Sequence, residues 1–145
     1  MRPFVAALTC VALLFVASAA PAQDFGQKVF DEAIVAAQDA GQAVQLAAEE
    51  IPQLCAAAAE ADVCPDVVNK HYSDFMNLGQ TFMLGMRFVG EAQVEASLAD
   101  TDAEYLDATK KVLLGKRAFD RVGAELARIA EALRTETKNV GLKEA

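Results

Sequence analysis

The sequence predicts an all-α protein, an antiparallel bundle of three long helices. Apolar residues recur every seven positions in three stretches, and the chain holds only 8 Gly and 4 Pro. No stretch alternates apolar and polar residues as a half-buried strand does. The 145 residues are enough for a single domain. Three amphipathic helices joined by short connections bury their apolar stripes by folding back on one another.

The first 22 residues have the three parts of a secretory signal peptide. Arg2 is positively charged, Phe4 to Val16 form an apolar run, and Ala20-Pro21-Ala22 offers small residues at a cleavage site. The run is shorter than the roughly 17 to 25 apolar residues of a membrane anchor. We therefore expect residues 1–22 to be a signal peptide and residues 23–145 to be a helical-bundle domain in the periplasm, without a transmembrane segment.

The first predicted helix follows the signal peptide and ends near Pro52, because proline disrupts a helix interior. Its apolar positions are spaced by seven residues and comprise Phe30, Ala37, Val44 and Ile51. A second set lies four residues after each of the first three and comprises Ile34, Gly41 and Ala48. Together the two sets predict one buried stripe.

The second predicted helix runs from Pro65 to about Leu98, with proline at its first position, where the missing N–H costs nothing. Its two apolar sets are Val68, Phe75, Phe82, Val89 and Ala96, and beside them Tyr72, Gly79 and Met86. In an alternative reading this helix breaks near Gly85 and Gly90, because each glycine weakens a helix by up to about 1 kcal/mol. The bundle would then have four helices.

The third predicted helix runs from about Asp102 to Lys138 and has the clearest heptad pattern. Thr101 and Glu104 form a candidate capping box at its start, and Asn139 and Gly141 are candidate stop signals. Its first apolar set is Tyr105, Val112, Phe119, Leu126 and Leu133, and its second is Ala108, Gly115, Val122 and Ile129. The pattern is typical of a coiled-coil seam.

Charge is divided unevenly along the chain. The formal net charge is −8, and residues 23–107 hold 16 acidic and 3 basic side chains, whereas residues 108–145 hold 9 basic and 5 acidic ones. We therefore expect the last helix to meet complementary charge on the other two. The acidic balance and the lack of a long basic run argue against a nucleic acid partner.

Two cysteines remain after the signal peptide, Cys55 and Cys64, and an even number in an oxidising compartment predicts one disulfide bond. On one continuous helix their Cα atoms would lie about 13 Å apart. A disulfide needs about 4.4 to 6.8 Å. The chain must therefore turn between them.

The candidate ligand-binding residues are few. His71 is the only histidine, so heme attachment, di-iron and common zinc sites lack their ligands. Met76, Met83 and Met86 fall on one stripe of the second helix, and thioethers suit Cu(I). The alternative interpretation is that these methionines fill gaps in the core. His71 would then be a residue at the edge of the core.

These features favour a non-enzymatic periplasmic protein that binds a protein or a small ligand, without a cofactor. One alternative is an acidic inhibitor or immunity protein that neutralises a basic periplasmic enzyme through charge complementarity. Another is a Cu(I) or heme carrier that uses His71 and the methionine stripe. Both a monomer and a homodimer are compatible with the heptad pattern.

Overall fold

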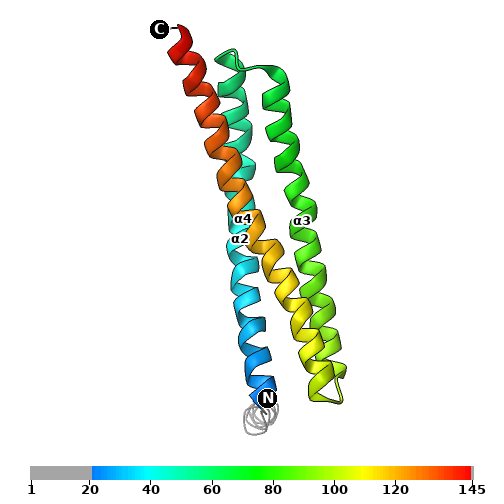
Figure 1. Ribbon diagram of the computed structural model, residues 1–145. Helices are drawn as coiled ribbons and strands as arrows, with labels where there is room; N and C mark the ends of the chain where they lie inside the picture. Colours follow the sequence, from blue (N-terminus) through cyan, green and yellow to red (C-terminus); the bar gives the residue numbers. More distant parts are fainter. Residues whose placement is uncertain (1–20, 145) are drawn as a thin grey trace, which may run out of the picture.

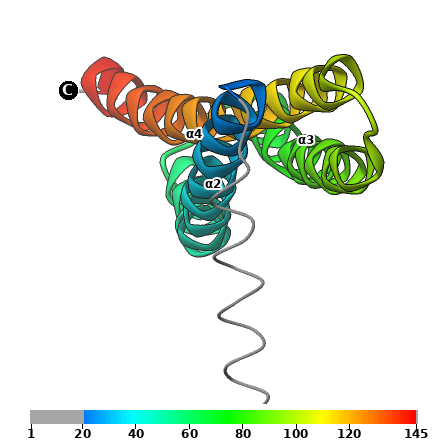
Figure 2. The same cartoon turned by 90° about the horizontal axis from the view of Figure 1, so that it is seen from below.

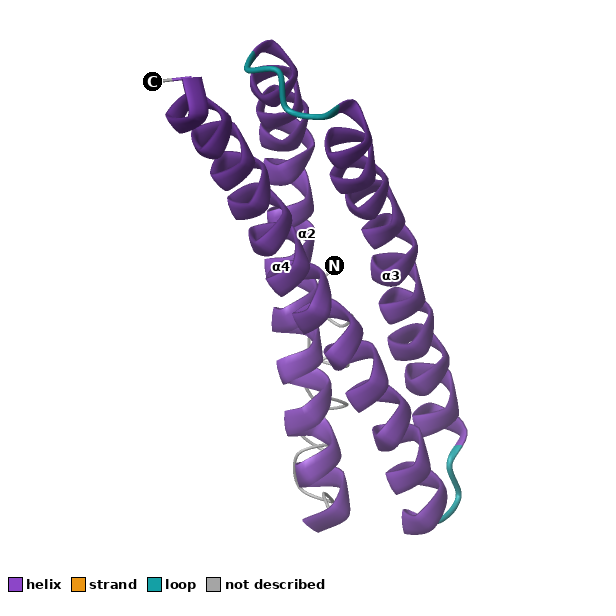
Figure 3. Ribbon diagram, turned by 45° about the horizontal axis from the view of Figure 1, so that its top comes forward, coloured by secondary structure: helices purple, strands orange, loops and turns teal. Residues whose placement is uncertain are grey.

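The computed structural model describes residues 21–144, which form three helices: α2 (Pro21–Glu60), α3 (Pro65–Leu98) and α4 (Asp102–Glu144). The described residues include no strand, and two short connections join the helices (Figures 1 and 3). The all-α prediction with three helices is therefore confirmed. The predicted signal peptide lies outside the described residues, apart from its last two positions.

The bundle is built around α4. Figure 1 shows α3 running antiparallel to both α2 and α4, and Figure 2 shows α4 lying across the other two helices. Both α2 and α3 pack extensively on α4, whereas they contact each other much less. The core of the protein therefore depends on the apolar stripe of α4.

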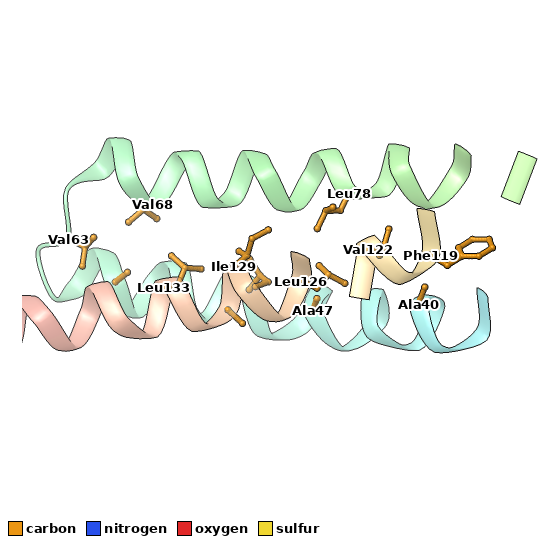
Figure 4. Packing of buried hydrophobic residues seen from close by; sticks show 13 residues of the cluster. Ala40, Ala47, Val63, Val68, Leu78, Phe119, Val122, Leu126, Ile129 and Leu133 are labelled. Atoms are coloured by element: carbon orange, nitrogen blue, oxygen red, sulfur yellow. The ribbon is translucent and has the colours of Figure 1, made fainter. Parts of the chain in front are cut away.

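The predicted heptad pattern of α4 is confirmed almost position for position. Tyr105 is half-buried, and all the other predicted positions are buried: Ala108, Val112, Gly115, Phe119, Val122, Leu126, Ile129 and Leu133. In Figure 4, Leu126, Ile129 and Leu133 lie in the core between the helices. Regular steps of three and four residues let one stripe of α4 face both neighbours.

The second apolar set was predicted one residue too far along in both α2 and α3. In α2 the buried residues are Ala33, Ala40 and Ala47, and in α3 they are Leu78, Gly85 and Ala92. The residues predicted at the next position are mostly exposed, including Ile34, Ala48, Tyr72, Gly79 and Met86. Small side chains occupy most of the buried positions because they allow α4 to approach closely.

The prediction that the first helix ends near Pro52 is wrong. The helix continues to Glu60, with Pro52 exposed inside it. Ile51 and Ala58 on either side are completely buried. Packing on α4 therefore offsets the hydrogen bond that proline cannot make. Similarly, α4 passes the predicted stop signals and reaches Glu144.

The true end of α2 is closed by backbone hydrogen bonds of the Schellman type. The N–H of Val63 donates to the carbonyl of Ala58 at 3.0 Å, and the N–H of Asp62 donates to the carbonyl of Ala59 at 3.1 Å. Asp62 has a φ of 61°, the left-handed conformation that this motif requires. The predicted turn between the two cysteines therefore lies at residues 61–64.

The four-helix alternative is wrong, because helix α3 is continuous through Gly85 and Gly90. Gly85 of α3 and Gly115 of α4 lie where the two helices approach each other closely. A Cβ atom added at Gly85 would lie 2.7 Å from Cε1 of Phe119, and one at Gly115 would lie 3.0 Å from the carbonyl oxygen of Gly85. Gly85 therefore marks a close helix crossing and does not break the helix.

The predicted capping box at the start of α4 is confirmed. The N–H of Glu104 donates to Oγ1 of Thr101 at 3.2 Å, and the N–H of Thr101 donates to Oε2 of Glu104 at 3.3 Å. The same carboxylate accepts a hydrogen bond from the N–H of Asp100 at 2.8 Å. Local side chains thereby accept hydrogen bonds from backbone N–H groups at the start of α4, which have no partner within the helix.

Ion pairs between helices confirm that α4 meets complementary charge. Lys111 pairs with Glu95 of α3, and Arg134 pairs with Glu50 of α2. The hydrogen bond to Glu95 raises the pKa of Lys111, and Glu91 nearby has its pKa lowered, mainly by its hydrogen bond from Arg87. Because these groups are exposed, they contribute more to orientation than to stability.

Candidate functional site

The predicted metal ligands do not come together within one chain. His71 is half-buried and occupies the same heptad position as Leu78 and Gly85, facing the core. Its Nδ1 atom is buried and has no hydrogen-bond partner among the residues that the structure describes. The three methionines lie on the outer side of α3, where Met76 is 58 %, Met83 65 % and Met86 48 % exposed. They therefore neither join His71 nor fill the core.

Spacing also limits what the methionines can bind. Met76 and Met83 are separated by seven residues, which corresponds to about 10 Å along a helix. One ion cannot contact both thioethers within the same helix. Cu(I) binding at the stripe of Met76, Met83 and Met86 stays a prediction, and of these residues Met83 and Met86 lie one turn apart.

Asp74 lies one turn from His71 and belongs to a small polar group between α3 and α4. Its carboxylate accepts a hydrogen bond from Nζ of Lys70 at 2.8 Å. This hydrogen bond lowers the pKa of Asp74, and the charges of Lys70, Arg128 and His71 lower it further. Lys70 and Asp74 form an ion pair within one turn of α3, in which the lysine is exposed and the aspartate is half-buried.

The two cysteines lie on either side of the turn between α2 and α3. Cys55 is half-buried within α2, and Cys64 is exposed at the N-cap of α3. Both are free thiols in this structure. Burial raises the pKa of the Cys55 thiol, which lowers its reactivity at neutral pH. The disulfide stays a prediction.

The disulfide is tested by mass spectrometry of protein purified from the periplasm. We expect alkylation under denaturing conditions to add no label unless a reductant is present. Reduction is expected to lower the free energy of unfolding by about 2 to 3 kcal/mol, because the bond closes a short loop in the unfolded chain. A chain that takes up two labels without reductant would contradict the prediction.

The surface feature that sequence reasoning missed is a shallow, open depression between α2 and α4. Its lining combines acidic and apolar side chains with one lysine: Asp31, Glu32, Val35, Ala36 and Asp39 from α2, and Lys116 and Asp120 from α4. The α2 residues share one side of that helix, since they are related by steps of three and four positions. The two residues from α4 lie some 80 positions further along the chain. No local pattern in the sequence predicts that they join the α2 residues.

Charge in this acidic depression is poorly compensated. Lys116 pairs with Asp120 at 3.0 Å, so the one cation is engaged within α4. Asp31 accepts a hydrogen bond from the amide of Gln27 at 3.0 Å. In the described part of the chain, no basic side chain forms an ion pair with Asp31, Glu32 or Asp39. Val35, which is 54 % exposed, provides an apolar patch among the carboxylates.

These carboxylates are not arranged as a metal site. Among residues 21–144, no group of three or more His, Cys, Asp or Glu side chains has a geometry suited to an ion. None of the described helices is apolar enough over a sufficient length to cross a bilayer.

No protein-family model, curated protein or solved structure matches this chain significantly.

Proposed function

We propose that this protein is exported to the periplasm and acts without catalysis, by binding a cationic segment of a partner protein at the acidic depression. The observation that carries the proposal is a set of three carboxylates, Asp31, Glu32 and Asp39, that surround the exposed Val35 and have no basic partner within residues 21–144. A lysine or arginine side chain matches this surface, since its charged end meets the carboxylates while its aliphatic part covers the valine.

The charge of the whole helix supports the same partner. Helix α2 has seven acidic residues and one basic residue, Lys28. A one-signed field of this kind accelerates encounter with an oppositely charged protein. The depression is shallow and open, which suits a protein surface better than a small molecule, because small ligands usually occupy enclosed apolar pockets.

A basic periplasmic enzyme is the second candidate partner, and the chain would then be its inhibitor. The formal net charge of −8 favours this candidate, because an acidic protein is steered toward a basic active-site cleft. Inhibition of a basic enzyme by the purified chain, lost at moderate salt, would distinguish an inhibitor from a simple binding protein.

The binding proposal is tested with a helical peptide of alternating Lys and Leu clusters as the cationic probe, measured by fluorescence anisotropy. The triple variant Asp31→Asn, Glu32→Gln, Asp39→Asn is expected to weaken binding about tenfold, which corresponds to about 1.4 kcal/mol. Higher salt should weaken binding to the unmodified protein, because the attraction is screened.

A matched triple variant controls for total charge. Glu49→Gln, Glu60→Gln and Asp66→Asn remove the same charge from exposed positions outside the depression. We expect this variant to change the affinity by less than about twofold. Equal weakening in both triple variants would show that net charge alone attracts the peptide, and the proposed site would be wrong.

A further inference from the structure

Helix α3 has a second apolar stripe that no part of the described chain covers. Its residues are separated by steps of four, three, four, three and four positions: Tyr72, Met76, Gly79, Met83, Met86 and Gly90. We call this stripe the outer seam. All six residues are exposed, and no described atom lies within 4 Å of a Cβ atom added at Gly79 or Gly90.

The outer seam is distinct from the side of α3 that packs in the bundle. That side places Leu78, Gly85 and Ala92 in the core. In Figures 1 and 2, α3 lies at the edge of the molecule, with α4 on one side of it. Alternating steps of three and four residues are the pattern of a helix that packs against another helix. Helix α3 thus has two stripes with this pattern, but only one of them packs against other helices in the described part of the chain.

The outer seam is also almost free of charge. From Tyr72 to Gly90 the only charged side chains are Asp74, which pairs with Lys70 at 2.8 Å, and Arg87, which pairs with Glu91 at 2.7 Å. A single acidic residue over this span is unusual in a chain with a net charge of −8. Depletion of charge is typical of the buried centre of a protein interface. In an acidic protein it also provides a face where two copies can meet without repulsion between carboxylates.

We propose that a second copy of this chain docks on the outer seam, with the two α3 helices antiparallel across a two-fold axis. In the register that aligns the two seams, Tyr72 lies opposite Gly90 of the second copy and Gly79 lies opposite its Met83. Met76 lies opposite Met86. Each two-fold pair therefore sets a large side chain against a glycine or against a flexible methionine, as close packing requires.

The alternative parallel arrangement fits less well. It would place Tyr72 against Tyr72, and it would place glycine against glycine at both Gly79 and Gly90. Such pairing leaves crowded and empty positions along one interface, which costs packing energy. The antiparallel register therefore follows from the order of large and small residues in the seam.

The dimer is independent of the acidic depression, which is lined only by α2 and α4. Docking through α3 leaves both depressions of a dimer accessible, so partner binding and self-association are tested separately. A failure of either one leaves the other unaffected.

The proposal is tested with the mature chain by analytical ultracentrifugation at micromolar concentrations. We expect a dimer, and we expect Met83→Glu to raise its dissociation constant about 100-fold, because it buries two like charges near the two-fold axis. Gly79→Leu is expected to dissociate the dimer as well, since it fills the space for Met83 of the second copy. Circular dichroism should show both variants folded, because both positions are exposed.

Leu46→Glu is the matched control, because Leu46 is an exposed apolar residue, 62 % accessible, on α2. It should leave the dimer intact. The register is tested with a photo-crosslinking amino acid at Met86, in a mixture of isotope-labelled and unlabelled chains. Antiparallel docking predicts an intermolecular link at Met76. A monomeric protein, a dimer that persists in Met83→Glu, or a link from position 86 to position 86 would overturn the proposal.

Discussion

Replacing Phe119 with Ala is expected to lower the free energy of unfolding by about 3 to 5 kcal/mol. Phe119 is 1 % exposed and lies at the crossing of α3 and α4, where its ring packs on Gly85 and on Phe82. The two ring centroids are 5.5 Å apart and the rings are tilted by 58°. The glycine leaves space that only a large side chain fills, so truncation leaves a cavity.

Urea unfolding followed by circular dichroism measures this loss. Phe25→Ala is the matched control, because Phe25 is 56 % exposed on α2 and its removal creates no cavity. We expect the control to lose less than about 1 kcal/mol. Similar losses of unfolding free energy in the two variants would mean that the ring of Phe119 does not stabilise the crossing of α3 and α4.

Replacing Gly115 with Ala is expected to destabilise the protein by about 2 kcal/mol, although alanine is the better helix former. The added Cβ atom would lie 2.7 Å from Cγ2 of Val89 and 3.0 Å from the carbonyl oxygen of Gly85. The valine can shift, but the carbonyl belongs to the backbone of α3. The two helices would therefore have to separate, which loosens the packing around Phe119.

The same substitution elsewhere in α4 should have the opposite sign. Within the described part of the chain, nothing lies within 4 Å of a Cβ atom added at Gly123. Gly123→Ala is therefore expected to stabilise the protein by up to about 1 kcal/mol, through helix propensity alone. If both variants shift the urea midpoint in the same direction, the close approach of the helices at Gly115 does not determine the effect of an added Cβ atom on stability.

The outer seam shows how a correct pattern can receive the wrong interpretation. Tyr72, Gly79 and Met86 were expected to face the core because they are apolar and spaced by seven residues. The structure instead buries Leu78, Gly85 and Ala92, one position earlier. Periodicity detects an apolar stripe but does not say whether the stripe faces the same chain. A helix with two stripes is therefore ambiguous until its neighbours are placed.

Local chemistry was sufficient to predict the number of helices, the start of α3 at Pro65, the capping box at Thr101 and the buried stripe of α4. These features depend on residues a few positions apart, whose hydrogen bonds and periodicity are encoded in a short stretch of chain. Only the tertiary structure decided that α2 continues through Pro52, which stripe of α3 is buried, and that Asp120 joins Asp31 in one depression. Each of these depends on α4 packing against a distant helix, and that contact energy outweighs local preferences.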